Sequence, residues 1–156
     1  MPADLPGKRV PAENWHLTLR FLGDTPPALR DGLVAELEST TLGEPFAVRF
    51  GGLGAFPHPR RARVLWLGVA AGAAGLRALA AATEEAAQRA GFPAADKPFS
   101  PHLTLSRIRP PRSVAALLEG AGPLDVGMEV DEVVLYRSHL GKGPARYEAV
   151  ARFALP

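Results

Sequence analysis

The feature that most constrains this chain is a tetrapeptide that occurs twice. His-Leu-Thr-Leu stands at residues 16–19 and again at residues 102–105, and it uses two of the four histidines. Polar and apolar residues alternate in both copies, which is the pattern of a half-buried strand. Each copy therefore predicts a strand that presents an imidazole and a hydroxyl on one face and sends its leucines to the core. The repetition also indicates two related halves.

The remaining elements are short and follow one another closely. Hydrophobic periodicity predicts, in order, a strand over 15–22, a helix over 26–40, strands over 46–50 and 64–69, a helix over 74–90, a strand from 102, a short helix over 114–119, and strands over 128–136 and 147–153. Thr25 is the expected N-cap of the first helix and Gly91 the expected end of the second. We expect the glycine-rich segment 51–57 to form a turn.

This order predicts an α+β fold with two lobes. Two pseudo-symmetric antiparallel sheets would line a central cleft with helices on the outside, and each lobe would carry one copy of the tetrapeptide. A length of 156 residues with 47% hydrophobic and 22% charged residues suits a single domain, residues 1–156, with a sizeable core.

Composition excludes several classes of protein. The chain has no cysteine, so disulfides, thiol nucleophiles and Cys-ligated zinc are excluded. No apolar run approaches the ~20 residues of a membrane span, and no signal peptide is recognisable, so we expect a cytoplasmic protein without a membrane partner. The net charge is only +2, but 15 of the 18 basic residues are arginines. This bias suits phosphate binding, and it equally follows from a GC-rich genome.

The two His-x-Thr pairs suggest a specific chemistry. If they face each other across the cleft, two imidazoles and two hydroxyls surround one point, which suits in-line displacement at phosphorus. One histidine can act as base and the other as acid near neutral pH, while the hydroxyls hold the non-bridging oxygens. A strained five-membered cyclic phosphodiester would suit such a site. No metal is needed, and the motif supplies only one nitrogen ligand per copy.

Two interpretations are open for a cluster of arginines and for one phenylalanine. Arg60, Arg61 and Arg63 could gather RNA phosphates, but a short charge run is more often simply solvated. Phe56, in the glycine-rich segment, could stack on a base, although a buried core position is the favoured interpretation.

Seven segments together carry a resemblance to a known family. They are residues 16–23, 54–57, 63–68, 97–105 and 135–138, the pair Gly143-Pro144, and Tyr147. In this order they resemble the 2H phosphoesterases, and among these the bacterial and archaeal 2'-5' RNA ligase branch, also called RNA 2',3'-cyclic phosphodiesterases. The resemblance extends over about Glu13 to Leu155.

The resemblance implies metal-independent opening of RNA 2',3'-cyclic phosphate ends to a 2'-phosphate, without a nucleotide cofactor. A 5'-hydroxyl attacking the same cyclic phosphate would form a 2'-5' linkage. The expected partners are RNA ends of this kind, tRNA fragments among them, and the expected state is a monomer. Two alternatives are a phosphodiesterase for another cyclic phosphate, such as a nucleotide-sugar cyclic phosphate, and a non-catalytic RNA-binding module with salt-sensitive binding.

The resemblance also assigns roles to individual residues. His16 would protonate the departing O3' and His102 would activate water, while Thr18 and Thr104 would bind phosphate oxygens. Arg107 stands where the branch commonly has an arginine. Strand parity places it on the leucine face, however, so it would reach the cleft only if the strand twists or ends there.

One departure from the family concerns residues 1–14. Members usually begin with an apolar strand and an amphipathic helix, and neither pattern is found here. The first lobe is therefore expected to lack a strand. Either the start site truncates the natural protein, or the lobe is reduced, with an open sheet edge and an activity in doubt.

Overall fold

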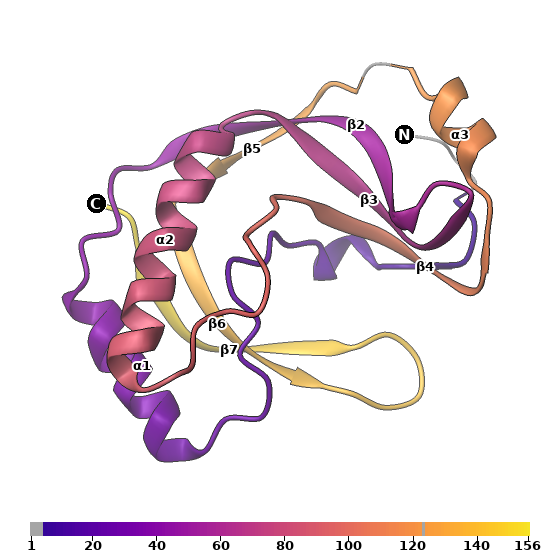
Figure 1. The fold of residues 1–156 in the computed structure, drawn as a ribbon. Coiled ribbons are helices and arrows are strands. Elements are labelled where there is room, and N and C mark those ends of the chain that lie inside the picture. Colours follow the sequence, from indigo (N-terminus) through magenta and orange to yellow (C-terminus); the bar gives the residue numbers. More distant parts are fainter. Residues whose placement is uncertain (1–4, 123) are drawn as a thin grey trace.

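The computed structural model describes residues 5–122 and 124–156, which form seven strands, three α-helices and one 3-10 turn (Figure 1). In chain order the elements are β1 (Lys8–Arg9), η1 (Ala12–Asn14), α1 (Pro27–Ser39), β2 (Phe46–His58), β3 (Arg61–Ala71), α2 (Ala73–Ala90), β4 (Leu103–Arg112), α3 (Ala115–Gly120), β5 (Val126–Val130), β6 (Glu132–His139) and β7 (Arg146–Ala154). Among the described residues, no helix is long and apolar enough to cross a membrane.

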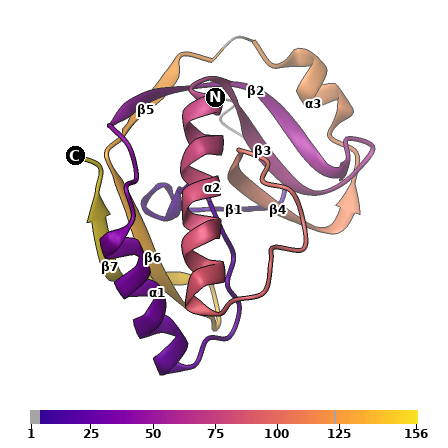
Figure 2. The same ribbon diagram turned by 60° about the vertical axis from the view of Figure 1, so that its left-hand side comes forward.

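The strands form two antiparallel sheets of unequal size. Five strands pair in the order β1-β4-β3-β2-β5, and β6 pairs with β7 in a separate two-stranded sheet. The helices α1 and α2 pack side by side next to β6 and β7, as the two views show (Figures 1 and 2). The predicted α+β fold with two antiparallel sheets is confirmed, although five strands against two make the symmetry approximate.

The predicted turn over 51–57 is wrong. These residues continue β2, which runs as one irregular strand and turns back into β3 only after His58. A register shift between Phe50 and Leu53 accommodates two glycines here, and Gly52 has a positive φ of 76° that side chains rarely adopt. A glycine pair thus marks a bulge in a strand, which periodicity alone does not distinguish from a turn.

The predicted strand over 128–136 is two strands that belong to different sheets. Val130 pairs with Phe46 at the edge of the large sheet, whereas Glu132 pairs with Ala154 in the small one. The change occurs at Asp131, where the backbone carbonyl accepts a hydrogen bond from the Leu155 amide at 2.8 Å. A single extended segment therefore links the two sheets directly.

Both long helices occur where periodicity predicts them, but only one end signal is correct. Gly91 ends α2 in the left-handed region, and the Phe92 amide bonds to the Ala87 carbonyl at 3.0 Å, as in a Schellman motif. The N-cap prediction for α1 is wrong. Pro26 occupies the cap position, and Thr25 instead donates to the Gly23 carbonyl at 3.0 Å.

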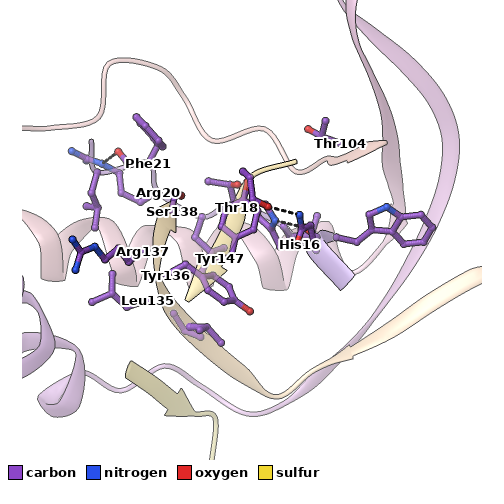
Figure 3. Close-up of a pocket in the computed structure, with 18 of the residues that line it drawn as sticks. His16, Thr18, Arg20, Phe21, Thr104, Leu135, Tyr136, Arg137, Ser138 and Tyr147 are labelled. Carbon is purple, nitrogen blue, oxygen red and sulfur yellow. Dashed lines mark hydrogen bonds between the residues drawn. The ribbon is translucent and has the colours of Figure 1, made fainter. Parts of the chain in front are cut away.

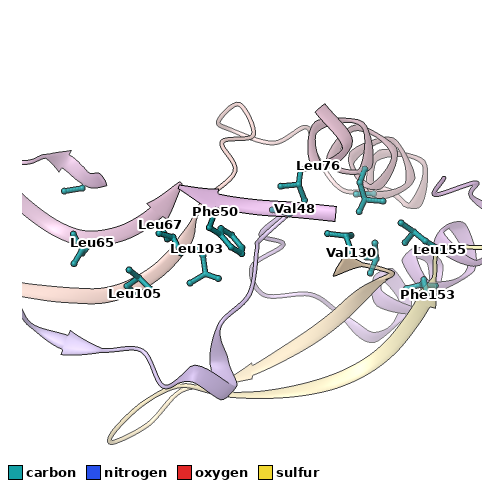
Figure 4. Close-up of a cluster of buried hydrophobic side chains, with 14 of the residues drawn as sticks. Val48, Phe50, Leu65, Leu67, Leu76, Leu103, Leu105, Val130, Phe153 and Leu155 are labelled. Atoms are coloured by element: carbon teal, nitrogen blue, oxygen red, sulfur yellow. The ribbon is translucent and has the colours of Figure 1, made fainter. Parts of the chain in front are cut away.

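One hydrophobic core runs through the molecule (Figure 4). Side chains from β3 and β4 occupy one part of it, and side chains from α2, β5 and β7 the other: Leu65, Leu67, Leu103, Leu105, Leu76, Val130 and Phe153. The motif leucines Leu103 and Leu105 are 5% and 1% exposed. The core thus fixes the backbone of the second motif from behind.

The segment before the first motif contains a short strand that the sequence did not predict. Lys8 and Arg9 pair with Arg107 and Ser106 of β4, and the Val10 amide donates to the Leu105 carbonyl at 2.8 Å. Two residues have too little periodicity to be recognised as a strand. Their effect is to place the residues before His16 along the edge of β4.

Candidate active site

The two His-Leu-Thr-Leu copies lie next to each other. Leu17 forms an isolated antiparallel bridge with Leu103 at the beginning of β4. Antiparallel register then places His16 opposite Thr104 and Thr18 opposite His102, all on the face away from the two leucines. The two histidines occupy a diagonal of this quartet, for which Cβ separations of about 7–8 Å are usual. That spacing leaves room for a phosphate between the imidazoles.

This arrangement differs from the predicted one in two ways. The motifs lie side by side on the floor of the cleft, so they do not face each other across it. The first motif is also not a regular strand, because within residues 15–22 only Leu17 forms a strand bridge. Phe21, which alternation assigned to the core, is 81% exposed because the strand pattern does not continue that far.

Both imidazoles are held by the same local contact. The Nδ1 atom of His16 lies 2.7 Å from the Asn14 carbonyl oxygen, and Nδ1 of His102 lies 2.8 Å from the Ser100 carbonyl oxygen. A carbonyl oxygen can only accept, so Nδ1 carries the proton in both rings. This contact fixes the tautomer and leaves Nε2 of each ring available to accept a proton. Asn14 is held in turn through its side-chain amide, which donates to the Ala145 carbonyl at 2.7 Å.

Two aromatic rings flank His16. The ring of Tyr147, on β7, lies 5.1 Å from the imidazole between centroids, and that of Tyr136, on β6, lies 6.4 Å away. Figure 3 shows these tyrosines beside His16 and Thr18, with Thr104 on the neighbouring strand. The small sheet therefore forms the wall of the cleft on the His16 side.

Two aromatic rings also flank His102, from the β2–β3 hairpin. Phe56 lies 5.2 Å away in an edge-to-face arrangement, and Trp66 lies 6.2 Å away. Phe56 is 38% exposed, so the prediction that it fills the core is wrong. Each histidine thus has two aromatic neighbours from an adjacent hairpin, which is the clearest sign of symmetry in the site.

Arg107 reaches the cleft because β4 contains a bulge. Leu65 and Trp66 are consecutive on β3, but their partners on β4 are Ser106 and Thr104. The extra residue shifts strand parity by one, so Arg107 returns to the face of Thr104. Ser106, predicted on that face, is fully buried instead and donates to the Pro6 carbonyl.

One cleft contains all six predicted site residues. Its lining includes His16, His102, Thr18, Thr104, Arg107 and Phe56. The arginines at 60, 61 and 63 are exposed and lie outside this lining. The structure therefore favours the interpretation that they are simply solvated. Within the described ranges, no group of three or more His, Asp or Glu side chains is placed to hold a metal ion.

Arg20 has a structural role that alternation did not indicate. The pattern placed it on the face of His16 and Thr18, but its guanidinium pairs with Glu84 of α2 and donates to the Pro93 carbonyl at 2.7 Å. Burial acts to raise the pKa of the Glu84 carboxyl. The hydrogen bonds that it accepts, above all the one from Arg20, outweigh this effect and hold the pKa below its ordinary value. The pair ties the end of the first motif to α2.

The chain is similar to a known family of proteins over most of its length. The sequence profile of the 2'-5' RNA ligase superfamily matches residues 5–142. The chain belongs to this superfamily. The family resemblance and the predicted class of enzyme are therefore confirmed, and they agree with a cleft that contains two His-x-Thr pairs.

Individual members of the superfamily resemble the chain over most of its length. An RNA 2',3'-cyclic phosphodiesterase of Aeropyrum pernix is 39% identical over 90% of this chain and 82% of its own length. The enzyme of the same name from Aquifex aeolicus is 34% identical over 96% of this chain and 82% of its own. The crystal structure of Escherichia coli LigT complexed with 3'-AMP superposes with a TM-score of 0.79 at 31% identity, covering 96% of this chain and 81% of that one.

The residues that sequence reasoning left without a role are aromatic. Tyr136, Tyr147 and Trp66 lie next to the histidines, yet they were assigned only to predicted strands and to the family resemblance, without a role in the site. An aromatic side chain on the polar side of a strand is the signal that could have identified them, since such a residue is not needed for the core.

Proposed function

We propose that this enzyme opens 2',3'-cyclic phosphate ends of RNA to 2'-phosphates by two-histidine acid–base catalysis. The observation that carries the proposal is the quartet of His16, Thr18, His102 and Thr104, with both Nδ1 atoms bound to carbonyls and both Nε2 atoms left for proton transfer. The names of its relatives, which are RNA 2',3'-cyclic phosphodiesterases, support the choice of substrate.

In the proposed mechanism, Nε2 of His102 accepts a proton from water as the water oxygen bonds to phosphorus. Nε2 of His16 donates its proton to O3' as the bond from phosphorus to O3' breaks. Thr18, Thr104 and Arg107 hold the non-bridging oxygens, whose charge shifts during the reaction. His16 is thus protonated and His102 neutral at the start. A 5'-hydroxyl in place of water would yield a 2'-5' linkage by the same steps.

Phe56 supplies the contact that would favour a nucleotide over other cyclic phosphates. Its exposed ring lies next to His102, within reach of the base attached to the same ribose. Stacking of a base on an aromatic ring contributes about 1–3 kcal/mol and tolerates all four bases. An RNA end without strong base preference is therefore the substrate that the site fits best.

The test replaces each histidine in turn. We expect His16→Ala and His102→Ala each to lower kcat for a 2',3'-cyclic nucleotide, with EDTA present, by about 10²- to 10⁴-fold. His58→Ala is the matched control, because His58 is an exposed histidine outside the cleft. Phosphorus NMR should show a 2'-phosphate as product. Undiminished hydrolysis in either cleft variant contradicts the mechanism, and RNA binding without turnover by the unmodified enzyme would favour a binding module.

A further inference from the structure

A row of side chains crosses the large sheet next to the catalytic quartet. Phe56 on β2 pairs with Val64 on β3, Val64 pairs with Arg107 on β4, and Arg107 pairs with Lys8 on β1. Cross-strand partners project from the same face of a sheet, so this row belongs to one surface. All four residues line the cleft. The row therefore connects an exposed aromatic ring to two cations.

A third cation extends this row along β4. Arg109 is two residues beyond Arg107, and because Ile108 between them is buried, both arginines project to the other side of β4, about 6.5–7 Å apart along the strand. It also lines the cleft and is exposed, while Ile108 between the two arginines is 2% exposed. Lys8, Arg107 and Arg109 thus form a basic track that begins beside the quartet and leads away from it.

The cations of the basic track differ in their ion pairs from several other arginines of the described residues. Within the described part of the chain, none of its three cations forms an ion pair with a carboxylate, whereas arginines at positions 20, 49, 89 and 152 all do. Like charges on directly paired positions, as at Lys8 and Arg107, are unfavourable unless an anion lies between them. The arrangement therefore points to an anionic ligand with more than one charge.

We propose that Lys8 and Arg109 form a subsite for the backbone phosphates of the RNA that precedes the cyclic phosphate. The proposal rests on the proposed function. A 2',3'-cyclic phosphate lies at the 3' end of its strand, so every further phosphate of the substrate lies on the 5' side. With the reacting phosphate at the quartet, the 5' side of the strand follows the basic track along β4. Phe56 stands in the same row to receive the terminal base.

The subsite gives the enzyme a preference for RNA over a single cyclic nucleotide. Each phosphate neutralised on a single strand contributes about 0.7 to the slope of log affinity against log salt. Lys8 and Arg109 together should therefore contribute about 1.4 to the slope for RNA and nothing to the slope for a mononucleotide.

The experiment compares two substrates in variants that leave the quartet intact. The substrates are a 2',3'-cyclic mononucleotide and a four-nucleotide RNA ending in a 2',3'-cyclic phosphate. For the double variant Lys8→Gln/Arg109→Gln we expect KM for the RNA to rise about tenfold, with its salt slope reduced by about 1.4. We expect kcat for both substrates and KM for the mononucleotide to stay unchanged. Arg112→Gln is the control, because Arg112 is exposed on the same strand but outside the cleft.

Each outcome separates the subsite from the catalytic proposal. An unchanged KM for the RNA overturns the subsite, and so does an equal loss of activity on both substrates. If the unmodified enzyme hydrolyses neither substrate, the proposed function fails. The subsite is then tested by fluorescence anisotropy with the same RNA, where the double variant must bind more weakly and with a smaller salt slope than the Arg112→Gln control. Thermal denaturation of each variant verifies folding.

Discussion

The indole ring of Trp66 occupies the space that a side chain at Gly54 would fill. A Cβ atom added at Gly54 would lie 2.2 Å from two atoms of the indole ring, far inside the 3.4 Å at which ordinary contact begins. Gly54 lies opposite Trp66 in the β2–β3 hairpin and is buried, so the methyl group has no free space. Gly54→Ala must therefore displace the indole by more than about 1 Å or spread the hairpin.

The displacement acts on stability and on catalysis. Overpacking of this kind costs about 1–3 kcal/mol, which for a chain of this length lowers Tm by roughly 2–12 °C. The indole is also a neighbour of Phe56, at 5.1 Å, and of His102. Because a misplacement of about 1 Å in a catalytic group can cost about 10²-fold in rate, we expect kcat to fall by one to two orders of magnitude. Calorimetry and cyclic nucleotide hydrolysis measure the two effects.

Two further variants isolate the cause. Gly120→Ala is a control, because a Cβ there meets no atom within 4 Å. The double variant Gly54→Ala/Trp66→Leu removes the clash, so its destabilisation should be smaller than the sum of the single effects by about 1 kcal/mol or more. A Gly54→Ala enzyme with unchanged Tm and kcat, or strictly additive single effects, would refute the argument.

Two predictions concern the helices. Glu84→Gln should lower stability at pH 7 by up to about 1 kcal/mol, because the ion pair with Arg20 is lost. The pKa of Glu84 is lowered in the folded state, so the difference in stability between the two proteins should be full above the ordinary carboxyl pKa and vanish as pH falls through the pKa of the folded state. Urea titrations from pH 7 to pH 3 measure this difference. A difference that grows in acid would contradict the prediction. Gly32→Ala, inside α1, should raise stability by about 0.5–1 kcal/mol, because the added Cβ meets only Ala90 atoms at 3.9–4.0 Å; a lower Tm in thermal denaturation would show that the contact is too tight.

The sequence predicted that the two His-x-Thr pairs line one cleft, because the alternation that orients each pair is local. Alternation of polar and apolar residues correctly separated His102 and Thr104 from Leu103 and Leu105, which are buried behind them at the beginning of β4. The same reasoning failed at Ser106 and Arg107, two and three residues after Thr104. The bulge that exchanges their faces depends on the pairing of β4 with β3, which no local pattern of letters reports.

The sequence also could not predict contacts between segments that are far apart in the chain. The aromatic walls come from two hairpins, and one of them is positioned by the change of sheet at Asp131, inside a segment that the sequence predicted as one strand. Similarly, the carbonyls of Asn14 and Ser100 select the tautomer of each histidine, but a backbone atom is the same in every residue and leaves no trace in the sequence. The sequence therefore predicted the histidine and threonine side chains that line the cleft. It did not predict the aromatic rings and backbone carbonyls that hold the histidines in place.

The bridge between Leu17 and Leu103 joins segments near the beginning of the chain and well past its middle. The centre exists only when α1, the β2–β3 hairpin and α2, all of which lie between them in the chain, have folded into place. The second imidazole belongs to His102, so no fragment of the chain that ends before residue 102 contains both imidazoles. Closing so long a loop costs entropy, so we expect the two motifs to come together only once the elements between them have folded.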